Sequence, residues 1–164
     1  MGEIEIRLAT ETDWPAIWPI VEAVVRAGET YAYPRDLTED AARALWMVSP
    51  PGTTLVAVEG GTVLGSVKVT PNHLGPGAHV ANASFMVGPS ARGRAVGRLL
   101  GETALDWART QGFRAMQFNA VVEANFHAVR LWRSLGFEII GTVPEAFDHP
   151  TQGLVGLHIM YRRL

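Results

Sequence analysis

The stretch from residue 79 to residue 110 changes from a strand pattern to a helix pattern across one short loop, and this change constrains the fold most. Apolar and polar residues alternate over residues 79–87, as in a half-buried strand. Gly88 and Pro89 then end the strand. From Val96 the apolar residues recur at helical spacing, which predicts a helix with one buried stripe. A strand–loop–helix unit of this kind is typical of folds that combine a sheet with covering helices.

The loop and first helical turn, residues 92–98, read Arg-Gly-Arg-Ala-Val-Gly-Arg. The first turn of a helix carries free N–H groups and a partial positive charge, so phosphate is a natural ligand there. Gly93 and Gly97 leave room for a ligand to approach the main chain, and arginine supplies paired donors for phosphate oxygens. A basic helix start with ordinary capping is the alternative interpretation, and both stay open at this point.

Similar patterns along the chain predict seven strands and four helices in one domain over residues 1–164. The strands are expected over residues 4–8, 53–59, 62–69, 79–87, 114–121, 137–142 and 154–162. In the strand over residues 114–121, Gln117, Asn119 and Val121 are expected on one face. The helices are expected from Thr10–Asp13 to about Ala27, from Thr38 to about Val48, from Val96 to Gly112 and from Asn125 to Leu135. Gly60-Gly61 is a hairpin signal, because glycine adopts positive φ at both turn positions. The order of elements predicts an α/β domain with a mixed sheet.

Two loops carry polar or aromatic side chains that could contact a ligand. Residues 28–34 contain Tyr31 and Tyr33, which either pack on neighbouring helices or form the wall of an acceptor pocket. Residues 145–153 are expected to form a polar loop that could close over a substrate.

Composition excludes several classes of function. The chain has 164 residues, a formal net charge of -2 and no cysteine, so a thiol nucleophile and a cysteine metal site are excluded. The charge does not favour nucleic acid or an anionic membrane as partner. The histidines lack metal-ligand spacing, and no apolar run approaches the roughly 18 residues of a membrane span. We therefore expect a cytoplasmic protein without a metal, and no partnership with membrane or nucleic acid.

Two motifs resemble the signatures of the GNAT superfamily of N-acetyltransferases. Arg92-x-x-Ala95-x-Gly97 after a strand is similar to the acetyl-CoA loop, with alanine at the position of its first glycine. Asn125-x-x-Ala128-x-x-Leu131-Trp132-x-x-x-Gly136-Phe137 is similar to the second signature. The resemblance implies a GNAT-like, mostly antiparallel twisted sheet of about seven strands with about four helices, and acetyl-CoA as cosubstrate. Dimerisation is common in this superfamily, so a homodimer is one expectation.

The resemblance also implies which residues bind acetyl-CoA. The thioester carbonyl is expected along residues 85–87, whose N–H groups would stabilise the oxyanion, and the amides of residues 94–98 would hold the pyrophosphate. The expected cofactor-binding residues are Phe85, Met86, Val87, Arg92, Gly93, Arg94, Ala95, Val96, Gly97, Arg98, Asn125 and Trp132. Trp132 stands where the superfamily commonly has a tyrosine that protonates the CoA sulfur. An indole N–H cannot serve as that acid, so Tyr31 or Tyr33 is the candidate replacement, with water as the alternative.

A narrower resemblance links the chain to fungal N-acetyltransferases that detoxify proline analogues such as azetidine-2-carboxylate. It depends on Asn82, Asn119 and Asn125, on Trp132, and on Thr30-Tyr31. It implies that Asn82 and Asn119 bind the carboxylate of a small amino-acid substrate, while Asn125 lies beside the pantetheine arm. In the alternative interpretation, Asn125 caps its helix and the other two asparagines satisfy backbone groups where strands diverge.

We accordingly expect direct acetyl transfer to a small amine, with Asn119, Asn82 and Tyr31 as the catalytic-site residues. Two alternatives remain, an acetyltransferase for another amine such as phosphinothricin or an antibiotic, and a non-catalytic acetyl-CoA sensor. The candidates for the general base are Glu29, Glu123, His127 and Asp148, or a water chain.

Overall fold

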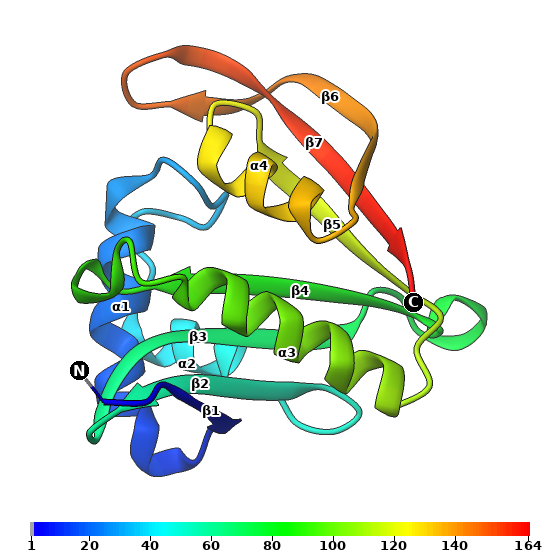
Figure 1. Cartoon of the computed structure of the whole chain (residues 1–164). Coiled ribbons are helices and arrows are strands. Elements are labelled where there is room, and N and C mark those ends of the chain that lie inside the picture. The colour runs from blue at the N-terminus through cyan, green and yellow to red at the C-terminus, as the bar shows by residue number, and fades with distance from the viewer. Residues whose placement is uncertain (1) are drawn as a thin grey trace.

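The computed structural model describes residues 2–164, and seven of its strands form one sheet in the order β1-β2-β3-β4-β5-β7-β6 (Figure 1). The strands are β1 (Glu5–Leu8), β2 (Thr53–Glu59), β3 (Thr62–Pro71), β4 (Val80–Val87), β5 (Ala115–Val122), β6 (Glu138–His149) and β7 (Gly153–Arg163). Neighbouring strands are antiparallel except β4 and β5, which are parallel. The expected mixed, mostly antiparallel sheet of seven strands is confirmed.

Four α-helices cover the sheet on both faces, in agreement with the sequence. They are α1 (Trp14–Ala27), α2 (Glu39–Trp46), α3 (Val96–Thr110) and α4 (Phe126–Ser134). Residues of α3 and α4 share one buried apolar cluster with the sheet, and residues of α1 and α2 share a second cluster. Figure 1 shows α3 and α4 in front of the sheet and α1 and α2 behind it. No helix of residues 2–164 combines the length and apolar character needed to cross a membrane.

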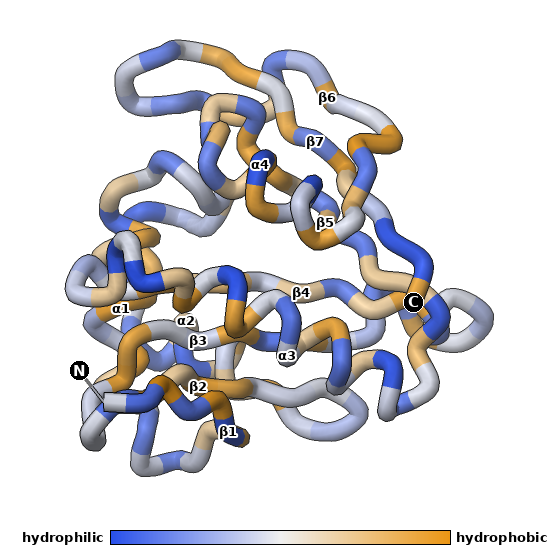
Figure 2. Tube along the Cα trace, viewed as in Figure 1, coloured by the Kyte–Doolittle hydropathy of each residue, from blue (hydrophilic) through white to orange (hydrophobic). Residues whose placement is uncertain are grey.

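The local sequence explains the central elements. In β4, Ala81 and Ala83 pack toward α3, whereas Met86 packs into the cluster of α1 and α2. Along α3 polar and apolar residues alternate with helical period (Figure 2), and the buried stripe contains Val96 and Leu100. Gly60 and Gly61 both have positive φ, at 54° and 82°, as the hairpin between β2 and β3 requires.

The two parallel strands separate after a short paired segment, and this separation positions the site. Only three residue pairs join β4 to β5, from Val80↔Ala115 to Asn82↔Gln117. Both strands continue for five more residues without pairing to each other. The edge of β4 from Ala83 onward therefore faces a gap, because β3 occupies only its other edge.

Two sequence expectations were wrong in the carboxyl-terminal third. Residues 145–149 do not belong to a polar loop that closes over a substrate, because they are part of β6 and pair with β7 from Phe147↔Val155 to His149↔Gly153. The pairing register shifts between Val143 and Phe147, where Glu145 has a φ of 52°. Val121 does not share a face with Asn119, because a bulge between Phe118 and Val121 turns its side chain into the core.

Candidate active site

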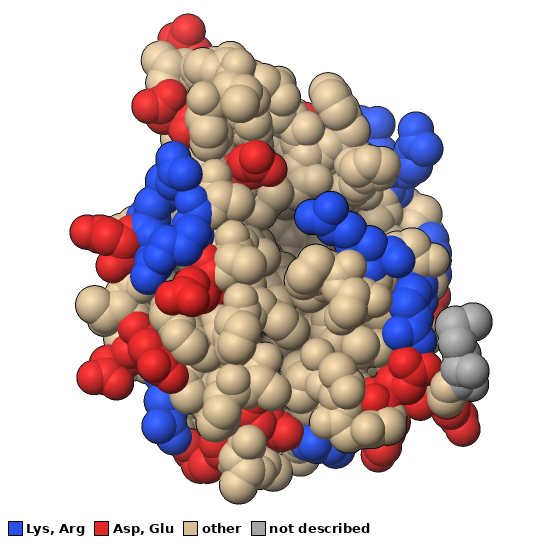
Figure 3. Space-filling view, turned by 90° about the vertical axis from the view of Figure 1, so that its left-hand side faces the viewer, with Lys and Arg blue, Asp and Glu red and all other residues tan. Residues whose placement is uncertain are grey.

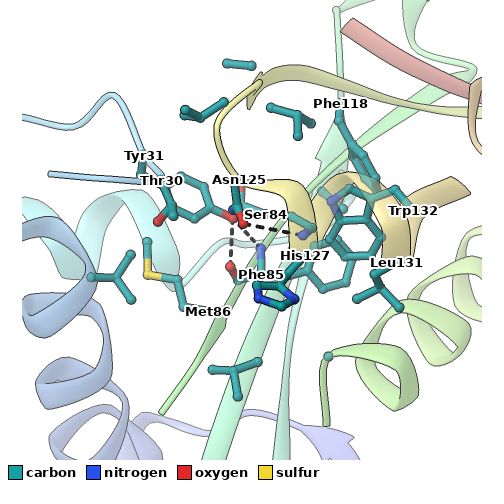
Figure 4. Close-up of a pocket in the computed structure, with 18 of the residues that line it drawn as sticks. Thr30, Tyr31, Ser84, Phe85, Met86, Phe118, Asn125, His127, Leu131 and Trp132 are labelled. Atoms are coloured by element: carbon teal, nitrogen blue, oxygen red, sulfur yellow. Dashed lines mark hydrogen bonds between the residues drawn. The ribbon is translucent and has the colours of Figure 1, made fainter. Parts of the chain in front are cut away.

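A cavity of about 600 Å³ lies where β4 and β5 separate. It opens on the face that carries the start of α3 and the loop after α1, where basic side chains lie beside a hollow (Figure 3). Figure 4 shows side chains from that loop, β4, β5 and α4 around the cavity. The lining residues used below are Tyr31, Asn82, Phe85, Met86, Val87, Arg92, Gly97, Phe118, Asn119, Asn125, His127, Leu131 and Trp132.

The main chain of β4 presents polar groups to this cavity at alternate residues. In antiparallel pairing every second residue bonds its partner strand, and the bond from Gly88 N–H to Leu64 C=O sets the phase. Met86 therefore directs its N–H and C=O toward Ser66 of β3. Phe85 and Val87 direct theirs into the gap. Of residues 85–87, only Phe85 and Val87 thus have an N–H group on the cavity side, which narrows the expected oxyanion site to two donors.

The Tyr31 hydroxyl forms hydrogen bonds with both main-chain polar groups of Phe85. It accepts from Phe85 N–H at 2.8 Å and donates to Phe85 C=O at 2.7 Å, although the residues are 54 positions apart (Figure 4). Burial raises the pKa of the Tyr31 hydroxyl. Tyr33 stacks on Tyr31 with ring centroids 5.8 Å apart. Both phenols line the cavity and also pack against the buried cluster of α1 and α2, so the tyrosines of loop 28–34 have features of both interpretations.

The turn before α3 adopts the conformation that exposes helix amides. Gly93 has φ 73° and Ala95 has φ 59°, both in the left-handed region. The first helical bond of α3 runs from Leu99 N–H to Ala95 C=O, which leaves the N–H groups of Val96, Gly97 and Arg98 without a partner in the helix. Arg94 N–H donates to Ala91 C=O at 3.2 Å, so among the amides expected at the pyrophosphate this one has a partner within the turn.

The three arginines of this segment have different environments. Arg94 pairs with Glu59 at 2.7 Å, and Arg98 bonds Ser134 and lies 3.5 Å from Glu102. Arg92 is exposed and lines the cavity. Within the described chain, no hydrogen bond or ion pair involves the Arg92 guanidinium. The residues Gly93, Arg94, Ala95, Val96 and Arg98 lie in the turn or helix start and do not line the cavity.

Helix α4 forms another wall of the cavity, beside the start of α3. At Gly97 an added Cβ would lie 3.4 Å from Leu131 Cδ2, and at Gly101 it would lie only 2.8 Å from Leu135 Cδ1. The two helices are therefore in close contact at Gly101 and slightly further apart at Gly97, nearer the cavity. Trp132 is buried and lies 4.6 Å from Phe85, between ring centroids. Asn125 accepts from Ala128 N–H at 3.4 Å and thus caps α4 while it lines the cavity.

The predicted carboxamides converge on the point where the strands separate. Asn82 donates to Gln117 C=O at 3.0 Å, which satisfies a backbone group there. Asn119 donates to Asn72 Oδ1 at 2.7 Å and accepts from Gln117 Nε2 at 3.0 Å. Both asparagines line the cavity, so each combines a structural bond with access to a ligand. Sequence reasoning missed Asn72, because no local pattern links a loop residue to a strand 47 positions away.

Of the four candidate bases, one lines the cavity and three do not. His127 lines it, whereas Glu29, Glu123 and Asp148 do not. The Glu123 carboxylate accepts from Gly156 N–H at 2.7 Å, so it ties the chain after β5 to strand β7. Among residues 2–164, no group of three His, Asp or Glu side chains is arranged to hold a metal ion.

Comparison with known proteins identifies this arrangement. A family model described as "Acetyltransferase (GNAT) family" matches residues 15–137. The structure of a GCN5-related N-acetyltransferase from Kribbella flavida is 60% identical, with a TM-score of 0.96 and 98% coverage of both chains. The structure of yncA from Salmonella typhimurium with its cofactor acetyl-CoA is 25% identical, with a TM-score of 0.85 over 99% of this chain and 95% of that chain.

A curated relative is similar over a shorter stretch. N-acetyltransferase aca1 of Schizosaccharomyces pombe is 35% identical over 85 residues, which is 52% of this chain and 41% of the relative. The chain thus matches less than half of the relative's length. Because the family model spans most of the chain and the bacterial structure matches it almost throughout, the chain belongs to the acetyltransferase (GNAT) family.

Proposed function

We propose that this enzyme transfers acetyl from acetyl-CoA to the amine of a small amino-acid-like substrate, by direct attack in a ternary complex. A proline analogue such as azetidine-2-carboxylate is the specific candidate. The observation that carries this proposal is that Asn82 and Asn119 line the same cavity as the free edge of β4. Carboxamide donors beside a strand edge can hold an acceptor next to a thioester.

The acetyl-CoA half of the cavity has the groups that this cosubstrate needs. Free N–H groups of the first α3 turn suit a diphosphate, and Arg92 adds a cation beside them. The gap beside Phe85 and Val87 can accept an extended pantetheine arm, with Asn125 and Trp132 on its other side. That yncA was solved with acetyl-CoA supports this assignment.

The acceptor half suits an amino acid with a free carboxylate. None of the side chains that line the cavity in the described structure is an aspartate or glutamate, so an anionic acceptor meets no like charge there. Asn82 and Asn119 offer N–H donors without the large desolvation cost of an unpaired buried charge.

In the proposed reaction the amine attacks the thioester directly, without a covalent acetyl-enzyme, and the chain has no cysteine that could carry the acetyl group. The neutral amine attacks the thioester carbon, the carbonyl oxygen becomes an oxyanion beside the β4 amides, and the C–S bond then breaks to release CoA thiolate. His127 is the proton acceptor among the lining side chains, with water as the alternative. Trp132 cannot protonate the thiolate, and a thiolate can take its proton from water.

The test is a thiol-release assay with acetyl-CoA and matched acceptor pairs. Azetidine-2-carboxylate and proline are each compared with the carboxamide of the same ring, which keeps the size of the substituent but removes its negative charge. We expect turnover with the acids and at least roughly tenfold lower kcat/KM with the amides. Equal rates within each pair would reject carboxylate recognition, and turnover only with phosphinothricin or other amines would reassign the acceptor. Binding of acetyl-CoA without turnover of any amine would indicate a sensor.

A further inference from the structure

The Tyr31 hydroxyl occupies a position that a thioester carbonyl would need. Phe85 N–H is one of the two β4 donors that face the cavity between residues 85 and 87, and Tyr31 accepts its hydrogen bond at 2.8 Å. A phenol oxygen and a carbonyl oxygen are both acceptors for an amide N–H. The free enzyme thus satisfies this donor with its own side chain, and a substrate carbonyl must compete with that side chain.

We propose that Tyr31 is a removable stand-in for the thioester carbonyl, which leaves Phe85 N–H when an acyl-CoA binds and returns when CoA departs. This inference rests on the proposed binding of acetyl-CoA along β4. It makes Tyr31 a positioning residue that lowers the preference for the acylated cosubstrate over free CoA, because a thioester carbonyl must displace the hydroxyl from Phe85 N–H. Free CoA lacks the thioester carbonyl and can bind while the hydroxyl stays in place.

The surroundings of Tyr31 allow this exchange at small cost. The hydroxyl also donates to Phe85 C=O at 2.7 Å, and that bond can persist while the N–H changes partner. The Tyr31 ring stacks on Tyr33 with an interplanar angle of 5°, and parallel rings can slide along each other. Arg26 anchors the end of the loop through the carbonyls of Arg35 and Leu37. The exchange therefore needs a small shift of the Tyr31 ring, because the phenol oxygen is fixed to it, and leaves the end of the loop attached.

The hydrogen bond from Phe85 N–H to the substrate oxygen should be stronger in the transition state than in the bound thioester. An oxyanion is a stronger acceptor for an N–H than a neutral phenol is, so Phe85 N–H is transferred more completely as charge develops on the substrate. Burial raises the pKa of Tyr31, and the hydroxyl consequently stays protonated and does not compete as an anion.

The test compares binding of acetyl-CoA and of CoA by titration calorimetry, for wild type, Tyr31→Phe and the matched control Tyr33→Phe. Removal of the Tyr31 hydroxyl leaves Phe85 N–H open. We expect Tyr31→Phe to bind acetyl-CoA about three- to tenfold tighter relative to CoA than wild type does. Tyr33→Phe should leave the ratio of the two affinities within about twofold of wild type.

The outcomes separate this inference from the proposed function. An unchanged ratio in Tyr31→Phe, or a ratio that shifts toward CoA, would overturn the stand-in role even though both compounds bind. Failure of wild type to bind either compound would instead reject the proposed cosubstrate. Circular dichroism checks the fold of each variant, and Tyr31→Leu, which also lacks the hydroxyl, provides the same comparison if Tyr31→Phe does not fold.

Discussion

The Arg94 guanidinium lies 2.7 Å from the Glu59 carboxylate, so the turn before α3 is tied to the end of β2. The side chains are only 25% and 18% exposed, which makes this ion pair less screened than one on the open surface. Arg94 is therefore a structural residue, whereas Arg92, two positions earlier, faces the cavity. The two arginines lie in the same short segment of the sequence, but Arg94 forms an ion pair within the fold and Arg92 lines the cavity.

This difference predicts different effects of two alanine variants. Arg92→Ala should weaken acetyl-CoA binding about three- to tenfold and reduce its salt dependence, because a phosphate loses a charged donor. Arg94→Ala should change affinity less than about threefold but lower the free energy of unfolding by about 1 kcal/mol. Calorimetric titration at two salt concentrations and urea unfolding measure these effects. A salt dependence that falls only in Arg94→Ala would reverse the two roles.

Gly97 provides the second prediction, because the space between α3 and α4 is narrow there. An added Cβ would make ordinary contact with Leu131 at 3.4 Å, so Gly97→Ala should fold and bind acetyl-CoA with modest loss. Gly97→Leu would fill the space that the pantetheine arm needs. We expect binding of acetyl-CoA to be abolished while the far-ultraviolet circular dichroism spectrum is retained. Calorimetry checks this, and undiminished affinity in Gly97→Leu would place the cosubstrate elsewhere.

The sequence predicted secondary-structure elements well where the pattern depends on neighbouring residues. The Gly60-Gly61 hairpin and the alternation of β4 depend on backbone conformation and burial within a few residues, and both were confirmed. The bulges were not predictable in this way, because a register shift depends on the partner strand. The contact of Tyr31 with Phe85 depends on how a loop folds back across the sheet. It could not be predicted from the periodicity of apolar residues in the sequence.

Ala95, which stands where the similar family motif has glycine, should lower the free energy of unfolding. Its φ of 59° lies in the left-handed region, which costs an L-residue about 1 kcal/mol. Ala95→Gly should therefore raise the free energy of unfolding by about 0.5–1 kcal/mol and preserve acetyl-CoA binding. Gly93→Ala is the reverse experiment, since φ is 73° and an added Cβ meets nothing within 4 Å. It should destabilise by a similar amount. Urea unfolding measures both, and a destabilised Ala95→Gly would contradict the argument.

The pair Arg7–Asp13 predicts how stability depends on pH. A hydrogen bond from Arg7 lowers the pKa of the Asp13 carboxyl from 3.8 to about 2. The unfolded chain therefore binds this proton more readily, so the pair stabilises the fold above about pH 4 and that contribution is lost as the pH falls toward 2. Asp13→Asn should lower the free energy of unfolding by about 1–2 kcal/mol at neutral pH. The difference from wild type, measured by urea unfolding, should disappear near the acid end of this range, and a difference that persists there would contradict the argument.

Asn119 provides the most direct test of the acceptor site, because its carboxamide has bonding capacity left over. It donates to Asn72 and accepts from Gln117, yet an amide has two N–H groups and two acceptor lone pairs. The remaining N–H can bind the carboxylate of an amino acid. Asn119→Ala should raise KM for the acceptor about tenfold and KM for acetyl-CoA less than about twofold. Asn72→Ala removes the partner but keeps Asn119, and should therefore have a smaller effect on the acceptor. Steady-state kinetics with each substrate varied separately distinguish the two roles, because equal increases in both KM values in Asn119→Ala would mean that Asn119 only supports the strands.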